Sequence, residues 1–467
     1  MRCYLYFLVV LLCLSGCAGN SSIKGSSHNI KGAEDGQEKR ARDAETIKNA
    51  KELYELGDMY ASGVGVNQDH AEAFLWFRKS AELGHAMAQY NLGVMYATGK
   101  GVVEDQIKAI SWYQKAADQG LYLAEYRLGI RYVDGHGVAK DNRVAFRWFQ
   151  KGAVQGYAPA QYNLGVMYAK GNGVAQDHAK AASWYQKAAE QWYPEAQHTL
   201  GAAYASGLGV VKDPKKAVKW LQRAANQGYA PAQSHLGVLY ISGDGVAKDY
   251  ARSFLWFGLA AEQGNADAQY NLGLMFYKGL GGVEQSYEDA FSWYRKAAAQ
   301  GLAKAQRDLG FLYLHGQGVV EDPSKAILWF KKAAEQGYVN ANFDLALMYI
   351  DGTGVERDYI LAKNWLEKAA AAEHPGAQHL LGVMYLSGTA VAQNDELAIK
   401  WFKKSAEHGF PAAQGKLAIL YLDKWGVSYI DQAQRLLEQS CDGGFTDACE
   451  VLAPLIEDGL ITQEQER

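Results

Sequence analysis

The stretch of sequence that decides the fold is residues 88–120, AQYNLGVMYATGKGVVEDQIKAISWYQKAADQG. In its first part the apolar or small residues Ala88, Leu92, Gly93 and Tyr96 are spaced i, i+4, i+5 and i+8. This spacing puts them on one face of an α-helix. The segment just before it, residues 70–83, shows the same period in a second apolar set that includes Trp76. We therefore predict two amphipathic helices in each unit of this kind.

The sequence also predicts where the helices begin and end. Gly99 suits the left-handed conformation that ends a helix, and Asp105 suits the cap at the start of the next one. In two other copies of the unit the cap is followed by proline, as Asp213-Pro214 and Asp322-Pro323. Proline is tolerated at the first helical position because the missing N–H would have no partner there.

The unit recurs along nearly the whole chain. Tryptophan stands 36 residues apart at positions 76, 112, 148, 184, 220 and 256, and after one extra residue at 293, 329, 365 and 401. A Leu-Gly pair keeps the same interval, with Ala346 and Ala418 replacing the glycine in two copies. About eleven helix pairs predict an all-α fold, an α/α solenoid, because stacked pairs bury an apolar layer that one pair would leave exposed.

Glycine in the middle of a helix costs about 1 kcal/mol relative to alanine, so the Leu-Gly pair needs a separate reason. The alanines at 346 and 418 argue against a need for positive φ. We expect a close approach of two helices, in which the bulky Trp and Tyr side chains of the neighbouring helix fill the space beside the small residue.

The unit A-x-x-x-L-G-x-x-Y-x-x-G-x-G-V-x-x-D-x-x-x-A-x-x-W-[FY]-x-K-A-A-x-Q-G resembles the Sel1-like repeat, a relative of the tetratricopeptide repeat. The match is nearly complete at residues 88–120 and 160–190, and it covers about residues 51–450. The resemblance implies an α/α superhelix that acts as an adaptor for protein complexes, often in bacterial envelopes or in host contact. We expect the solenoid over residues 46–455 and a C-terminal tail over 456–467.

Two departures from the pattern stand out. The turn Gly279–Val283 is one residue longer than its counterparts, and Ser286 stands where the capping Asp is expected. Trp192 occupies a place where most repeats have glycine. A left-handed Trp would be strained, so we expect that helix to end differently. Trp192 and Tyr193 are then candidate exposed anchors for a protein partner, and a locally repacked turn is the alternative.

The N-terminus predicts export. Tyr4–Leu14 is an almost unbroken apolar run, too short to span a bilayer comfortably and typical of a signal peptide. The ending Leu14-Ser15-Gly16-Cys17 resembles the lipobox of bacterial lipoproteins, which implies removal of residues 1–16 and a membrane anchor of acyl chains on Cys17. An ordinary cleaved signal or a short anchor is the alternative.

Ala18, the residue after Cys17, resembles the pattern of lipoproteins sorted to the outer membrane, so we expect the protein there, facing the periplasm. Residues 17–45 are polar and lack periodicity, which predicts a flexible tether.

Cys441 and Cys449 lie at the end of the last repeat's second helix and in the first turn of the next helix. The eight-residue step resembles the bridges of cysteine-rich bacterial members of the family, which implies a disulfide that holds the C-terminal helix. Two small buried thiols are the alternative.

The repeats carry no recognisable catalytic motif, whether H-E-x-x-H, G-x-S-x-G or a P-loop. The only S-x-x-K, Ser21–Lys24, lies in the tether, and His374 and His379 are not spaced as a metal-binding pair. We therefore expect no catalytic residue, cofactor or metal. The net charge of −4 gives no sign of a nucleic-acid partner.

These features favour a non-catalytic, membrane-tethered scaffold that mediates protein–protein interactions in the bacterial cell envelope. Two alternatives stay open. Some cysteine-rich relatives resemble penicillin binders or weak β-lactam hydrolases, which would make the chain a cell-wall enzyme. The third function is a surface factor that contacts host cells. The sequence does not name the partner.

Overall fold

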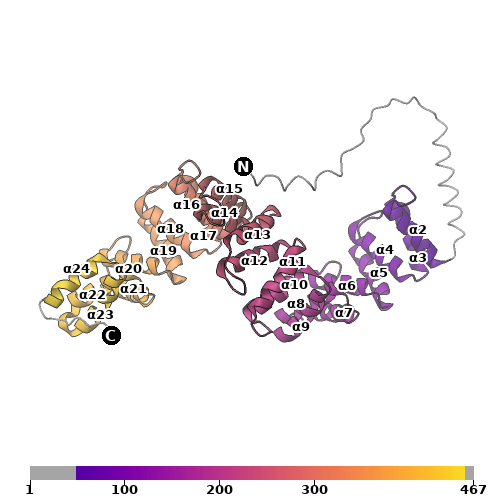
Figure 1. Ribbon diagram of the computed structural model, residues 1–467, viewed down its shortest axis with the longest axis horizontal. Helices are drawn as coiled ribbons and strands as arrows, with labels where there is room; N and C mark the ends of the chain where they lie inside the picture. Colours follow the sequence, from indigo (N-terminus) through magenta and orange to yellow (C-terminus); the bar gives the residue numbers. More distant parts are fainter. Residues whose placement is uncertain (1–48, 458–467) are drawn as a thin grey trace, which may run out of the picture. The chain divides into compact units, whose positions relative to one another are not determined.

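The computed structural model describes residues 49–457, and within that range every regular element is a helix. There are 23 α-helices, labelled α2 to α24, and one short 3-10 helix, η1 (Figure 1). Their bounds are α2 Ala50–Ser62, α3 His70–Glu82, α4 Ala86–Thr98, α5 Gln106–Asp118, α6 Tyr122–Asp134, α7 Asn142–Val154, α8 Ala158–Lys170, α9 His178–Glu190, α10 Pro194–Ser206, α11 Pro214–Asn226, α12 Ala230–Ser242, α13 Tyr250–Glu262, α14 Ala266–Lys278, α15 Tyr287–Ala299, α16 Ala303–His315, α17 Pro323–Glu335, α18 Val339–Asp351, α19 Tyr359–Ala371, α20 Pro375–Ser387, α21 Asp395–Glu407, α22 Pro411–Trp425, η1 Gly426–Tyr429, α23 Ile430–Asp442 and α24 Thr446–Glu457.

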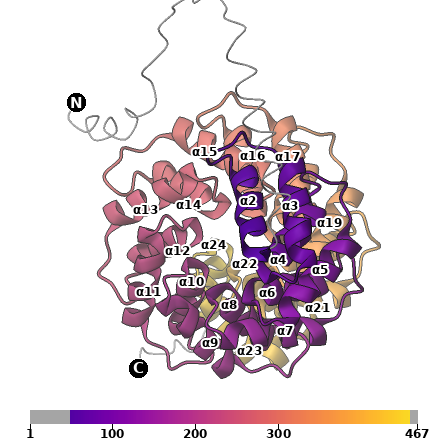
Figure 2. The same ribbon diagram turned by 90° about the vertical axis from the view of Figure 1, so that its right-hand side faces the viewer.

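From α2 to α7 and from α9 to α24, helices that follow one another in the sequence pack against one another, as α13 and α14 do in Figure 2. Each repeat is a pair, from α2 and α3 to α22 and α23, and α24 packs on the last pair. The chain therefore forms the predicted all-α solenoid of eleven helix pairs. Its contacts divide it into two compact units, with the boundary near the start of α8 at Ala160 and Gln161.

The predicted helix ends are confirmed. Gly99 has a φ of 69°, and the Asp105 carboxylate accepts a hydrogen bond from the backbone N–H of Lys108 at 2.9 Å. Pro214 and Pro323 stand at the first positions of their helices. Ser286 replaces Asp as a cap in the longer turn and accepts from the N–H of Asp289 at 3.1 Å. Side-chain capping thus survives the insertion.

The close approach expected at the mid-helix glycines is present, but of the two predicted partners, Trp and Tyr, only the tyrosine position fills the space. A Cβ added at Gly93 would lie 2.7 Å from the ring of Tyr113, and Gly129 stands in the same way against Phe149. The ring that fills this space belongs to the residue after the tryptophan, not to the tryptophan. Trp112 is half-buried, and the Lys115 ammonium lies 3.9 Å from its ring centre.

A pair of glutamines ties the two helices of most repeats together. In the second repeat, buried Gln89 of α4 accepts a hydrogen bond from Gln119, the residue after α5, at 2.8 Å. Gln89 also donates to the carbonyl of Ala81 in the preceding repeat at 3.1 Å. Because an unpaired buried amide is costly, these bonds explain the recurrent glutamines as part of the scaffold.

The expectation that the helix before Trp192 ends differently is wrong. Helix α9 ends at Glu190, in phase with the other second helices, and Trp192 takes the left-handed φ of 65° that glycine takes elsewhere. The side chain points outward and is 63% exposed, so the ring meets no steric obstacle. The packing of α9 and α10 holds the turn in place against the backbone strain.

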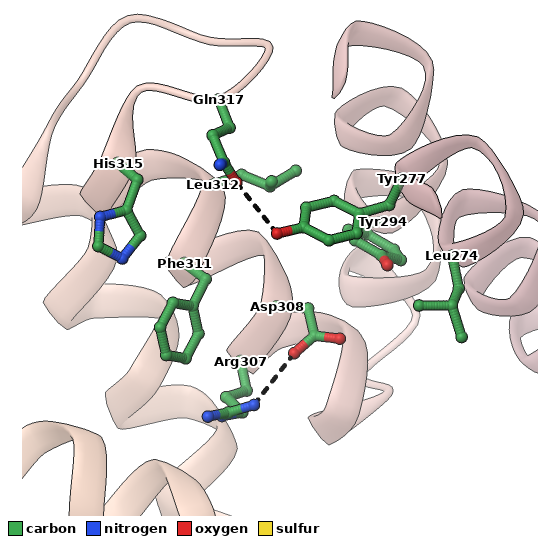
Figure 3. A pocket seen from close by; sticks show the side chains of 9 residues that line it. All are labelled: Leu274, Tyr277, Tyr294, Arg307, Asp308, Phe311, Leu312, His315 and Gln317. Atoms are coloured by element: carbon green, nitrogen blue, oxygen red, sulfur yellow. Dashed lines mark hydrogen bonds and ion pairs between the residues drawn. The ribbon is translucent and has the colours of Figure 1, made fainter. Parts of the chain in front are cut away.

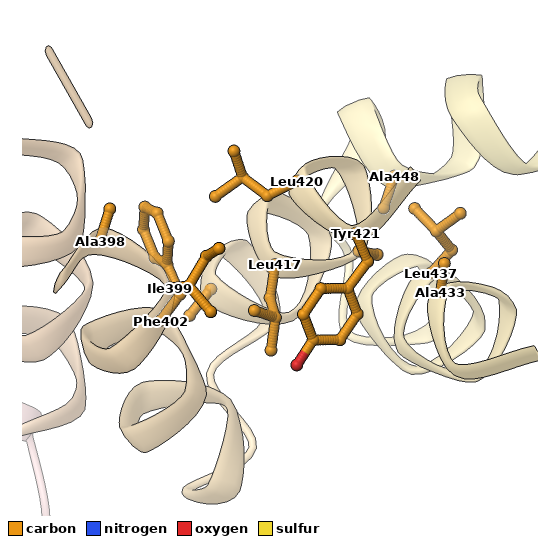
Figure 4. Packing of buried hydrophobic residues seen from close by; sticks show 11 residues of the cluster. Ala398, Ile399, Phe402, Leu417, Leu420, Tyr421, Ala433, Leu437 and Ala448 are labelled. Carbon is orange, nitrogen blue, oxygen red and sulfur yellow. The ribbon is translucent and has the colours of Figure 1, made fainter. Parts of the chain in front are cut away.

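The last repeat departs from the others in its loop. Helix α22 is longer, and η1 replaces the glycine-rich turn before α23. Figure 4 shows how α24 completes the core there, with Ala448 beside Ala433 and Leu437 of α23. A disulfide joins Cys441 at the end of α23 to Cys449 in the first turn of α24, with their Cα atoms 5.0 Å apart.

Reduction of this disulfide, or a Cys441→Ser/Cys449→Ser double substitution, is expected to destabilise α24 by about 2–3 kcal/mol, the loop-closure entropy of a cross-link this short. Hydrogen exchange of α24 measures the effect, and α2, at the other end of the solenoid, serves as the internal control. Equal exchange of α24 in the oxidised and reduced proteins would contradict the prediction.

Candidate binding surface

The two positions that follow the buried glutamine of each first helix vary between repeats. In α4, α8 and α14 these two positions hold Tyr-Asn, as in Tyr90-Asn91. In α16 they hold Arg307-Asp308, and α18 has Asp344 at the second of them. Side chains at these positions meet their counterparts in the next repeat, so a change in one repeat alters a surface shared by several first helices.

Arg307 stands at the centre of a polar cluster on this surface. Its guanidinium donates to Asp344 of α18, with Nε 2.7 Å and Nη2 3.4 Å from the two carboxylate oxygens. Its Nη1 lies 3.5 Å from Asp308, and the Tyr270 hydroxyl of α14 donates to Asp308 at 2.9 Å. The cluster therefore links three consecutive repeats and holds one guanidinium and two carboxylates.

The two carboxylates lie in a poorly solvated environment. Burial raises the pKa of Asp308 and of Asp344, although hydrogen bonds and the charge of Arg307 oppose the rise. Burial alone would lower the pKa of Arg307, but its bonds to Asp344 and the charge of Asp308 raise it overall. The guanidinium thus stays charged and partly neutralises the pair.

A cavity of about 520 Å³ opens beside this cluster (Figure 3). Its polar side is formed by Arg307 and Asp308, and its wall by Phe311 one turn further along α16. The Tyr277 hydroxyl, from α14, donates to Gln317 at 3.3 Å across the opening. The full set of lining residues is Leu274, Tyr277, Tyr294, Arg307, Asp308, Phe311, Leu312, His315 and Gln317.

The chemistry of this cavity suits a side chain that has an apolar stem and a hydrogen-bond donor at its tip. Aromatic faces pack against the stem, while Asp308 and the tyrosine oxygens accept from the tip. The sequence alone did not indicate these residues as a site. The sequence feature that could have indicated the site is the replacement of Tyr-Asn by Arg307-Asp308. It points to a polar cluster only when the structure shows that α18 places Asp344 beside Arg307.

A second polar group on the same face is the contact between His198 of α10 and His235 of α12, whose ring centres are 5.7 Å apart. Burial lowers the pKa of both, and that of His198 falls to about 4 with a further contribution from His235. Both rings are therefore neutral at pH 7.

Because the folded-state pKa of His198 lies below its usual value near 6.5, folding stability should fall as the pH drops from 6.5 toward 4. The substitution His198→Tyr installs the residue that α8 and α14 have at this position. We expect it to remove up to about 3 kcal/mol of the folding stability that the wild type loses as the pH drops. Urea unfolding at several pH values measures it. His136→Tyr, at an exposed loop position, is the control. If His198→Tyr loses as much unfolding free energy at low pH as the wild type, the prediction is contradicted.

The remaining site residues predicted from the sequence are Trp192, Tyr193 and Cys17. Trp192 is exposed, and the guanidinium of Arg223 lies 5.9 Å from its ring. Tyr193 is half-buried against Tyr162, with ring centres 5.6 Å apart, so it is not an exposed anchor. Cys17 lies outside the described residues. In the range 49–457 no helix is long and apolar enough to cross a membrane, and no cluster of side chains there could hold a metal ion.

A solenoid of stacked helix pairs whose variable side chains gather on the first helices defines a repeat-built scaffold. The Sel1 repeat model matches eleven segments of the chain: residues 53–85, 86–121, 123–157, 158–191, 194–229, 230–265, 266–302, 303–338, 339–374, 375–410 and 411–445. The chain therefore belongs to the Sel1 repeat family.

One solved structure of similar length agrees with this membership. The chain is 35% identical to c5321, a protective antigen of uropathogenic Escherichia coli with an SLR fold, over 93% of this chain and 91% of that one, with a TM-score of 0.73. A Sel1 repeat protein from Oxalobacter formigenes is 32% identical over 52% of this chain and 96% of its own, with a TM-score of 0.49. A comparison with functionally described proteins found no significant match.

Proposed function

We propose that this protein is a non-catalytic scaffold of the bacterial cell envelope, and that the cavity between α14 and α16 receives a basic side chain of a protein partner. Sel1 repeat proteins generally mediate protein–protein interactions. The observation that carries the choice of site is the cavity beside Arg307, Asp308 and Asp344, a cluster with one more negative than positive group. An incoming Lys or Arg would balance that charge.

In-cell photocrosslinking tests the site. A photoreactive residue in place of Phe311 should crosslink to one defined protein, and Asp308→Asn in the same chain should reduce the yield. Asp267→Asn, in the exposed pair with Lys304, is the matched control and should leave the yield unchanged. Equal crosslinking from a position on the second helices, such as Ser292, would contradict the proposal.

The membrane anchor is a separate part of the proposal, supported by Leu14-Ser15-Gly16-Cys17. Growth with an alkyne-labelled fatty acid should label the protein, and Cys17→Ser should abolish the label. Cys13→Ser changes a neighbouring cysteine of the same apolar run and should leave the label in place. Labelling of the Cys17→Ser variant would contradict lipidation at Cys17.

Two other functions have their own tests. The similarity to a protective antigen favours a chain that is accessible on the cell surface as the second candidate. Protease treatment of intact cells should spare a chain that faces the periplasm and should cleave one on the surface.

Rapid hydrolysis of a chromogenic β-lactam by the purified protein, lost on Asp308→Asn, would instead establish the enzyme alternative.

A further inference from the structure

We infer that helix α6 carries a second binding site, in which Arg127 and Arg131, with Tyr90, hold the carboxylates of an acidic segment of a protein partner. This inference rests on the proposal that the chain binds proteins, but not on the cavity between α14 and α16. All three residues lie in the first of the two compact units, so the site is contained within one body.

Arg131 occupies a position that is apolar in all the other first helices. The residues at that position are Met59, Met95, Met167, Ala203, Leu239, Met275, Leu312, Met348, Met384 and Leu420. Where methionine stands there it packs in the core, and Met95 is 7% exposed. Arginine at this position brings a charge to the edge of the core, and nothing in the packing of the repeat requires it.

The two guanidiniums lie on the same face of α6, one helical turn apart. Arg127 donates from Nε to the hydroxyl oxygen of Tyr90 at 3.4 Å. Tyr113 lies buried beneath them, and burial raises the pKa of that phenol although the charges of both guanidiniums oppose the rise. Because the Tyr90 oxygen accepts from Arg127, its hydroxyl hydrogen is left to point toward a bound anion.

Neither guanidinium has a carboxylate partner among residues 49–457. The acidic residue on the inner part of the same helix, Glu125, is buried and accepts a hydrogen bond from Gln155 at 2.8 Å. This contrasts with Arg307, which is held by Asp344. Two like charges one turn apart repel each other, so an anion bound between them would relieve the repulsion and complete their hydrogen bonds.

The geometry suits carboxylates in particular. A guanidinium presents paired N–H groups in a plane that matches a carboxylate, and two of them in succession suit consecutive acidic side chains. Free phosphate shares this chemistry, so the test separates the two sources. Aromatic side chains around the site, including Tyr126 and Tyr157, provide a surface for the rest of the segment.

Fluorescence polarisation with labelled hexaglutamate and the purified protein tests the site. The double variant Arg127→Asn/Arg131→Met installs the residues that α4 and α8 have, so the repeat keeps side chains that its siblings already pack. We expect it to weaken hexaglutamate binding by roughly tenfold or more. The control Arg143→Ala/Arg147→Ser removes two exposed charges of the same repeat and should keep the affinity within about twofold.

Three results would overturn the inference: no binding of hexaglutamate by the wild-type protein, equal loss in the two double variants, or displacement by phosphate far beyond that by chloride at equal ionic strength. The last result would assign the site to free phosphate. Circular dichroism confirms that both variants are folded. The crosslinking from position 311 is independent of these outcomes, so failure at α6 and failure of the cavity proposal can be told apart.

Discussion

Replacing Gly101 with alanine is expected to destabilise the first repeats by about 3–5 kcal/mol. Gly101 is the second glycine of the turn between α4 and α5 and has a φ of 72°, where an L-residue is strained. A Cβ there would also overlap the backbone carbonyl of His70 at the start of α3. Neither a rotamer change nor a small shift can remove a clash with backbone, so the contact between the two repeats should open.

Gly84→Ala is the matched control, because Gly84 has a φ of 89° but open space around its Cβ position. It should cost only the backbone strain, about 1–2 kcal/mol. Urea unfolding measures the total change in unfolding free energy. Hydrogen exchange should show that Gly101→Ala destabilises mainly α2–α5, because each repeat contacts only its neighbours. Equal destabilisation by the two substitutions would show that the contact with His70 does not matter.

Replacing Arg307 with leucine should cost about 3–5 kcal/mol at pH 7, because it leaves Asp344 and Asp308 without their positive partner. Without that partner, the already raised pKa of each carboxyl rises further. A carboxyl whose folded-state pKa exceeds the unfolded value near 3.9 destabilises the fold as the pH rises through the folded-state pKa. The loss caused by Arg307→Leu should therefore be small near pH 4 and grow toward pH 7.

The comparison for this experiment is Lys304→Leu, a substitution in the same helix as Arg307 that breaks the ion pair of Lys304 with exposed Asp267 of α14. Exposed pairs contribute about 0–1 kcal/mol, so this variant should stay close to the wild type at every pH. Urea unfolding of both variants at several pH values gives the profiles. A loss in Arg307→Leu that is the same at pH 4 and pH 7 would mean that the two carboxylates are solvated.

Much of the fold could be predicted because it is local and repeated. Gly99 and Asp105 mark helix ends through the conformation of single residues, and ten tryptophans in register show which ends belong to the same unit. The mid-helix glycine also indicated a close approach. The prediction named both Trp and Tyr as partner rings and only the tyrosine faces the glycine, because Trp112 and Tyr113 are adjacent and periodicity alone does not separate them.

The candidate sites could not be predicted from one repeat. The bond between Arg307 and Asp344 spans 37 residues, and that between Tyr270 and Asp308 spans 38, so each joins variable positions of different repeats. At Trp192 the preference of a single residue led to a wrong expectation. Strain predicted a different helix end, but the packing of the whole turn outweighed the preference of one residue for negative φ.

The glutamine pairs bear on how chain length can change in this family. The bond between Gln89 and Gln119 lies inside one repeat, whereas the bond from Gln89 to Ala81 and the approach of Gly101 to His70 reach the repeat before. Deleting or duplicating 36 residues at matching turns would therefore bring together the same kinds of residue at the new junction. Repeat number can then grow or shrink in whole steps by recombination, while the first-helix side chains of each copy diverge independently.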